Sequence, residues 1–208
     1  LALATDIAPS DSRPRVVAFL YVMLLLGMVV SSIVFGVLLS EFSQVRLIQV
    51  IQGAAAATMI LNVIALWKQE ARDPSRTRGR QANEPGFVAA WRQLTSGNRW
   101  SRVLVSVGLG TAAFSMQDIL IEPYGGEILH LSVGETTALT GFLAGGTLLG
   151  FLFASRALTS GIDPFRLAAV GVVAGLAAFP AVILSAHLES AAIFRTGTVL
   201  IGFGAGLF

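Results

Sequence analysis

Long apolar stretches without charged residues dominate the chain. A helix needs about 20 such residues to cross a hydrocarbon core of roughly 30 Å. Four stretches meet this requirement: residues 16–39, 47–67, 136–155 and 167–186. A fifth stretch, residues 103–121, is interrupted only by Asp118, and a sixth runs from Ala191 to Phe208. The pattern predicts an all-α membrane protein with six transmembrane helices.

The composition agrees with lipid as the surroundings of these helices. Hydrophobic residues make up 54% of the chain and charged residues only 12%, whereas soluble domains carry about 25% charged residues. The mean hydropathy is +0.75 and the isoelectric point is near 9.7. Because the basic residues lie between the apolar stretches, we do not expect a nucleic-acid partner. There is no cysteine, which excludes disulfides and thiolate metal sites within the chain.

The basic residues also predict the orientation in the membrane. Cytoplasmic loops carry an excess of Lys and Arg, and all but two of the 14 basic residues lie before the first stretch or in alternate connections. The exceptions are Arg46 and Arg195. We therefore expect residues 68–102 to face the cytoplasm and residues 122–135 to face the periplasm.

Residues 68–102 form the one long hydrophilic segment and divide the chain. Pro74, Gly79 and Pro85 argue against a continuous helix there. We predict the end of one helix bundle in residues 1–67, a basic cytoplasmic linker in residues 68–102 and the start of a second bundle in residues 103–208. The chain both begins and ends without the features of natural termini, which indicates a central piece of a longer protein.

Within the linker, apolar residues recur at helical spacing. Phe87, Val88, Trp91 and Leu94 stand beside Arg92. This spacing is typical of a short amphipathic helix in the headgroup layer, and a solvated linker with two stray aromatic residues is an equal alternative.

Glycines four residues apart predict where helices pack. Small residues at this spacing let two helices approach closely in lipid. The sequence supplies three such pairs, Gly141/Gly145, Gly146/Gly150 and Gly171/Gly175. They identify packing and give no information on transport.

The polar residues near the end of the third apolar stretch are the candidate site. Ionisable residues inside a span are costly and often functional, and Asp118 and Glu122 lie four apart on one helix face. Gln117 is adjacent, and Pro123 and Tyr124 are expected to close the helix. The alternative is that the span ends there and both carboxylates lie in the periplasmic interface.

No pattern indicates a hydrolytic, redox or metal site, so we expect neither an enzyme nor a bound metal ion. An imidazole can ligate the magnesium of a chlorophyll, but His130 lies in the predicted periplasmic connection and His187 at the outer end of the fifth predicted span. Neither is a strong candidate for a pigment ligand.

Several sequence blocks resemble a known family. Six spans around a long basic linker resemble the centre of a twelve-helix major facilitator, whose two halves are joined there. More specifically, the chain resembles the light-harvesting complex assembly branch of that superfamily, the PucC and LhaA proteins of purple phototrophic bacteria. The blocks are ATDIAP (residues 4–9), IQVIQGA (48–54), LWKQEAR (66–72) and MQDILIEPYGG (116–126).

This resemblance implies a non-enzymatic factor in the bacterial inner, or intracytoplasmic, membrane that assists antenna assembly. It implies bacteriochlorophyll or carotenoid as pigment. The implied partners are membrane lipids, the antenna α and β polypeptides, a pigment synthase and the membrane insertion machinery. Gln117, Asp118, Glu122 and Tyr124 remain the candidates for ligand binding or coupling, and the resemblance places them on a helix that usually lines the facilitator cavity.

The chain departs from transporting facilitators in two places. The usual loop signature between the eighth and ninth helices survives only as Arg156, Asp163 and Arg166, with Gly150 and Gly161, at altered spacing. The Gly-Pro element of antiporters is missing from residues 16–39. A secondary transporter of a small solute or a pigment precursor remains the alternative function.

Overall fold

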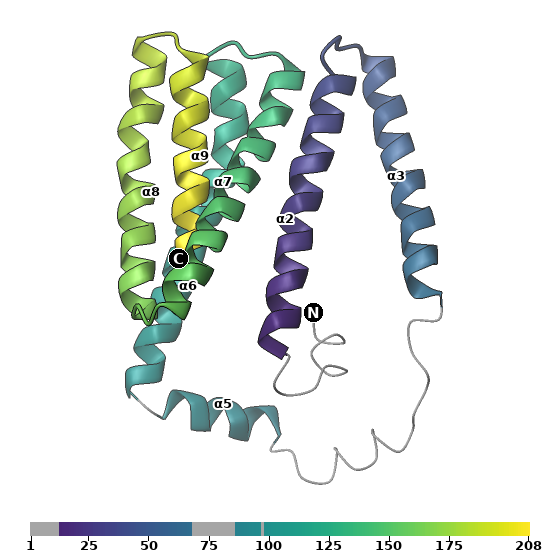
Figure 1. Cartoon of the computed structure of the whole chain (residues 1–208). Coiled ribbons are helices and arrows are strands. Elements are labelled where there is room, and N and C mark those ends of the chain that lie inside the picture. The colour runs from purple at the N-terminus through teal and green to yellow at the C-terminus, as the bar shows by residue number, and fades with distance from the viewer. Residues whose placement is uncertain (1–12, 68–85, 97) are drawn as a thin grey trace. The chain divides into compact units, whose positions relative to one another are not determined.

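The computed structural model describes residues 13–67, 86–96 and 98–208. All regular elements in this part of the chain are α-helices (Figure 1). The helices are α2 Arg13–Leu38, α3 Gln44–Leu66, α5 Phe87–Thr95, α6 Asn98–Glu127, α7 Val133–Thr159, α8 Pro164–His187 and α9 Ala191–Leu207. The all-α prediction is confirmed, and the predicted amphipathic segment is a helix.

Five of these helices, α2, α3, α6, α7 and α8, are long and apolar enough to cross a membrane. Helix α9 is apolar but has 17 residues, so the count of six spans stays a prediction. Many large apolar side chains on the long helices are exposed, for example Val37, Met59 and Val173. Exposed apolar surface of this extent marks contact with a membrane or with other protein segments, and the fold fits a multi-pass membrane protein.

The helices form two compact units. One comprises Leu1–Arg46 with Ala113–Phe208, and the other comprises Leu47–Ala112. In the first unit, α2 packs against α7, and α9 packs against both α7 and α8. The predicted division at residues 67 and 102 stays a prediction, and residues 68–85 of the predicted linker lie outside the described residues.

The first unit has its core between α6, α7, α8 and α9. Leu139, Ala178 and Phe194 are fully buried there, together with Ile121 and Ile201. A second cluster, at the other end of α7 and α9, contains Ala154, Ala157, Leu167 and Leu207.

Capping residues fix the ends of the helices in this unit. Helix α7 ends where Gly161 adopts a φ of +84° and the Ile162 N–H bonds the Ala157 carbonyl, the pattern of a Schellman motif. Asp163 then accepts from the Phe165 N–H at 2.7 Å, and Pro164 occupies the first position of α8, where its missing N–H costs nothing.

The end of α6 differs from the prediction. Pro123 and Tyr124 were expected to close the helix, but α6 continues through Pro123 to Glu127. Proline removes one donor from the backbone ladder, which membrane helices tolerate when neighbouring groups compensate. Tyr124 and Gly125 are held against α8, α7 and α9 by packing, so tertiary contacts override the local signal.

Candidate functional site

Tyr124 faces the core of the first unit. Its ring lies against Phe194 of α9, with 5.5 Å between the ring centroids. Its hydroxyl makes a long hydrogen bond of 3.4 Å to the Val182 carbonyl of α8. Tyr124 therefore joins α6 to two neighbouring helices.

Glu122 faces a different neighbour. Its Oε1 accepts a hydrogen bond from the Thr140 hydroxyl of α7. Asp118 lies one turn earlier on the same face, is exposed, and has no hydrogen-bond or ion-pair partner among the described residues. Thr140 thus fixes one of the two carboxylates and leaves the other open.

Gln117 lies on the same face of α6 as Tyr124 and not on the face that carries Asp118. The two residues are seven positions apart, which places them on one face of a helix. Gln117 is half-buried, and its Oε1 is buried with no donor within the described part of the chain. The four candidate residues therefore divide into two pairs on neighbouring faces of α6, and they do not form one cluster.

The predicted glycine pairs occupy tight helix contacts in five of six positions. A Cβ atom on Gly146 would strike the backbone of Val199, and one on Gly150 would strike Phe203, both on α9. Gly202 and Gly206 of α9 are equally close to the α7 backbone. The two helices therefore meet with no side chains between their backbones.

Helix α9 meets α8 in the same way on another face. A Cβ on Gly171 would lie 2.6 Å from the Gly204 carbonyl oxygen, and the reverse distance is also 2.6 Å. A Cβ on Gly175 would lie 3.0 Å from the nearest atom of the Phe114 ring on α6. These glycines pack the bundle.

Gly141 and Gly145 behave differently from each other, although the sequence places them in one pair. Ser32 of α2 lies against Gly141, where an added Cβ would be 2.8 Å from the serine oxygen. A Cβ on Gly145 would meet no described atom within 4 Å. The expected packing role of Gly145 is therefore not seen, because α2 crosses α7 on the Gly141 side.

The residues of the loop signature lie at the connection between α7 and α8. The Asp163 carboxylate is used as the N-cap of α8, since it accepts from the Phe165 and Arg166 N–H groups. Arg156 and Arg166 are exposed. Asp163 therefore has a structural role that local sequence explains.

The two histidines lie at helix ends. His130 follows α6 with a φ of 53°. His187 is in the last turn of α8, where its Nδ1 is 3.3 Å from the Ile183 carbonyl, beside a shallow apolar groove lined by Pro180, Ile183 and Leu184.

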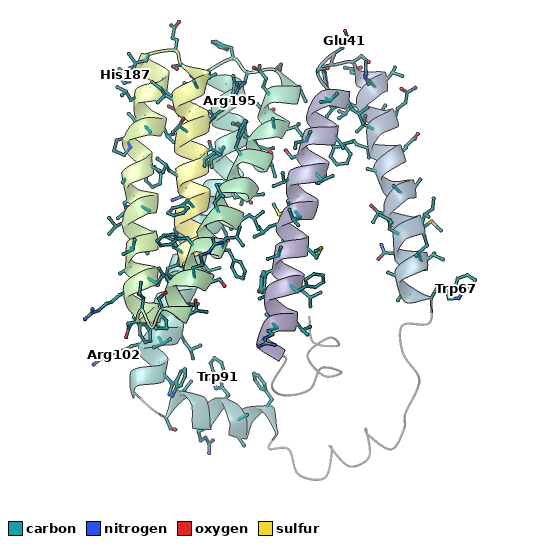
Figure 2. All side chains as sticks on the ribbon, viewed as in Figure 1. Glu41, Trp67, Trp91, Arg102, His187 and Arg195 are labelled. Atoms are coloured by element: carbon teal, nitrogen blue, oxygen red, sulfur yellow. The ribbon has the colours of Figure 1, made fainter. Side chains whose placement is uncertain are left out.

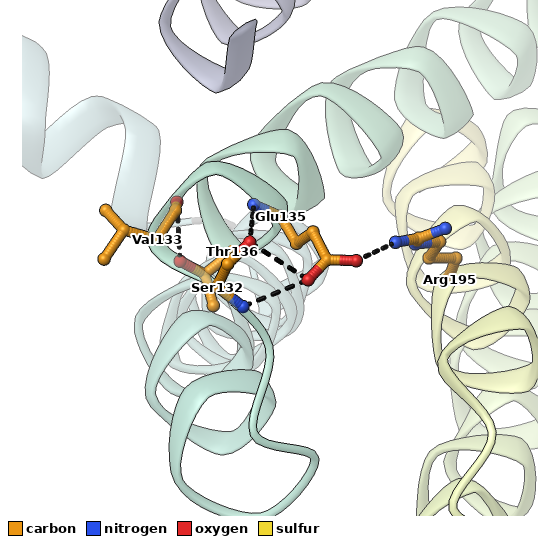
Figure 3. Close-up of polar contacts among 5 residues, drawn as sticks. All are labelled: Ser132, Val133, Glu135, Thr136 and Arg195. Carbon is orange, nitrogen blue, oxygen red and sulfur yellow. Dashed lines mark hydrogen bonds and ion pairs between the residues drawn. The ribbon is translucent and has the colours of Figure 1, made fainter. Parts of the chain in front are cut away.

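An ion pair that the sequence analysis did not identify joins α7 to α9 (Figure 3). Arg195 Nη2 is 2.9 Å from Glu135 Oε1. The other oxygen, Oε2, accepts from the Ser132 N–H at 3.0 Å, and the Ser132 hydroxyl accepts from the Glu135 N–H at 3.3 Å. One carboxylate thus completes the capping box of α7 and the salt bridge.

Arg195 has a further contact at this point. Its guanidinium lies 5.9 Å from the centre of the Phe142 ring, within reach of a cation–π interaction. Its Nε is buried without an acceptor among the described residues. The spacing of Ser132 and Glu135 signals a capping box, but their link to a residue 60 positions away depends on the packing of α9.

Comparison with known proteins identifies the family. The family model described as PUCC protein matches residues 1–208. Protein PucC of Rhodovulum sulfidophilum is 53% identical over 210 residues, which cover all of this chain and 46% of that protein. A Rhodobacter capsulatus protein, described as an uncharacterized protein in the puhA-bchM intergenic region, is 47% identical and is covered over 44% of its length.

A more distant relative has a different name. The bacteriochlorophyll synthase 44.5 kDa chain of Rhodobacter capsulatus is 24% identical over 211 residues, which are 48% of its length. No solved structure matches the chain. The chain spans a little less than half the length of these relatives. Because the family model covers all 208 residues, the chain belongs to the PucC family.

Proposed function

We propose that this chain is part of a membrane protein that assists the assembly of light-harvesting antenna complexes in purple bacteria. The observation that carries this proposal is the match of the entire chain to the PucC family. The resemblance of the sequence to this family implies a role in antenna assembly. Five helices suited to the membrane support it, because antenna polypeptides assemble in the same bilayer.

We infer that the seven described helices belong to the centre of a twelve-helix major facilitator fold. The support is the packing of α9 on α7 and α8 and the contact of α2 with α7, since two bundles of such a carrier meet face to face. On this reading α9 is the sixth span. Residues 68–102 face the cytoplasm and residues 122–135 the periplasm of the inner or intracytoplasmic membrane.

The proposed activity is non-enzymatic and consists of guiding bacteriochlorophyll, carotenoid or antenna polypeptides. One distant relative is named as a bacteriochlorophyll synthase chain, which is consistent with pigment handling near a synthase and the insertion machinery. Asp118 is the proposed open polar contact on α6, and Glu122 is its partly satisfied neighbour.

The direct test is affinity purification of the full-length protein from cells that are building antenna complexes. We expect antenna α and β polypeptides and bacteriochlorophyll to co-purify, in contrast to a tagged unrelated membrane protein from the same cells. A preparation without pigment absorption and without antenna polypeptides contradicts the proposal.

The role of the carboxylates needs its own variant. The double change Asp118→Asn and Glu122→Gln keeps side-chain size and leaves an acceptor for Thr140. Glu127→Gln, at the exposed end of the same helix, is the matched control. We expect a lower antenna yield, measured by near-infrared absorbance, only with the double variant. An unchanged yield removes both carboxylates from the mechanism, including that of a transporter.

A further inference from the structure

Helix α5 has a one-sided aromatic surface with no protein covering it among the described residues. The side chains of Phe87, Val88 and Trp91 are 80%, 68% and 53% exposed. The Phe87 and Trp91 rings stack, with 6.2 Å between their centroids, because residues four apart share a helix face. Ala89 and Arg92 lie on other sides of the helix. A helix of nine residues is marginal in water unless its apolar face is buried.

The position of α5 in the chain brings this face to the membrane surface. Helix α5 ends at Thr95 and α6 begins at Asn98. The candidate span of α6 starts at Trp100. With only two residues between the helices, α5 is held at the level where α6 enters the bilayer. Figure 2 shows the Trp91 side chain projecting from α5.

The charges near this face match a lipid surface. Arg92 and Arg102 are exposed, and neither has an acidic partner among the described residues. Arginine side chains at the membrane surface bury their methylene groups while the guanidinium reaches the phosphates. Tryptophan is enriched at the same level of the bilayer.

We propose that α5 is an interfacial anchor that lies in the headgroup layer next to the start of α6. Phe87, Val88 and Trp91 enter the upper acyl region, and Arg92 and Arg102 contact lipid phosphates, with a preference for anionic lipids. An apolar helix face in this position is buried about 5–10 Å into the headgroup and acyl boundary. The continuity of α5 with the membrane helix α6 favours lipid over a second protein as the occupant. This anchor would hold the end of the linker at the membrane surface. The inference does not depend on the proposed function.

Fluorescence quenching of Trp91 tests the proposal in the full-length chain. The sequence has three tryptophans, so Trp67→Phe with Trp100→Phe leaves Trp91 as the reporter within residues 1–208. Any tryptophan elsewhere in a longer protein is replaced as well. The protein is reconstituted in vesicles of phosphatidylcholine and phosphatidylglycerol that carry bromine at shallow or deep acyl positions. We expect blue-shifted emission and about twofold stronger quenching by the shallow label than by the deep one.

A matched pair of variants links the result to the apolar face. Phe87→Glu and Ala89→Glu both add a carboxylate in the first turn, where the helix dipole acts on them alike. Only Phe87→Glu places it among the aromatic residues. We expect Phe87→Glu to shift Trp91 emission to the red and to reduce lipid quenching, while Ala89→Glu leaves both unchanged. Equal spectra for the two variants overturn the proposal.

Quenching by aqueous acrylamide distinguishes the other occupants. If acrylamide quenches Trp91 and brominated lipid does not, the face lies in water and the proposal is wrong. If neither agent quenches Trp91, protein covers the face and the proposal is also wrong. Both outcomes leave the antenna-assembly function intact, since that function is tested by co-purification.

Discussion

The hydroxyl of Ser32 on α2 accepts a hydrogen bond from the backbone N–H of Gly141 on α7, at 2.9 Å. The same hydroxyl donates to the carbonyl of Thr137, the group that an α-helix pairs with the N–H of residue 141. Ser32 thus bonds both the N–H and the carbonyl of one backbone hydrogen-bonding pair of α7. This contact requires a residue without a side chain at position 141.

Gly141→Ala should weaken the contact of α2 with α7. The added methyl would lie 2.8 Å from the Ser32 oxygen and 3.1 Å from its Cβ, and such overpacking costs about 1–3 kcal/mol. Gly145→Ala is the control, because a Cβ there meets no described atom within 4 Å. We expect a lower melting temperature in detergent for the first variant only. Equal melting temperatures contradict the assigned contact.

Ser32→Ala should have a smaller effect than Gly141→Ala. It removes two interhelical hydrogen bonds, and such bonds in membranes contribute about 0.6 kcal/mol each on average. Ser31→Ala removes only a bond to Met28 of the same helix and serves as control. Chemical denaturation in mixed micelles measures the difference, and a loss equal to that of Ser31→Ala excludes the bridge.

Gly202→Ala should disrupt the contact between α7 and α9. The new methyl group would strike the Leu143 carbonyl, and neither the methyl group nor a backbone carbonyl can move away by changing rotamer. We expect a loss of about 1–3 kcal/mol or more, seen as lower folded yield and lower melting temperature. Gly27→Ala has open space around it and should retain wild-type stability. A stable Gly202→Ala variant argues against direct backbone contact.

The Glu135 and Arg195 pair should show weak but measurable coupling. The Arg195 and Glu135 side chains are 37% and 46% exposed, and exposed pairs contribute about 0.2–1 kcal/mol. Glu135→Gln retains a side chain that can complete the capping box, so a double-mutant cycle with Arg195→Gln isolates the charge interaction. We expect the coupling to fall with added salt. Additive effects of the two single variants would show that the pair does not contribute.

Much of the fold follows from the sequence because helix length and hydrophobicity decide it locally. The apolar stretches at residues 47–67 and 167–186 correspond closely to α3, Gln44–Leu66, and α8, Pro164–His187. Local chemistry also accounts for Asp163 at the start of α8. Pro123 does not end α6 as its local sequence predicts, because the contacts of Tyr124 and Gly125 with other helices keep the helix continuous.

The candidate site could be predicted only in part, because adjacent residues of a helix point about 100° apart. Gln117 and Asp118 were grouped by their proximity in sequence, and they lie on different faces of α6. Gly141 and Gly145 share one motif but not one neighbour. The pairing of Glu135 with Arg195 needs α9 beside α7, which no local pattern indicates.

The two glycine faces of α9 have a consequence for biogenesis. Helices α7 and α8 touch each other little, and each packs extensively on α9. Because α7 and α8 are synthesised before α9, we expect these two helices to lie in the bilayer without an extensive contact with each other until α9 is inserted. Insertion of α9 would then join the two helices, because Gly202 and Gly206 pack on α7 and Gly204 packs on α8.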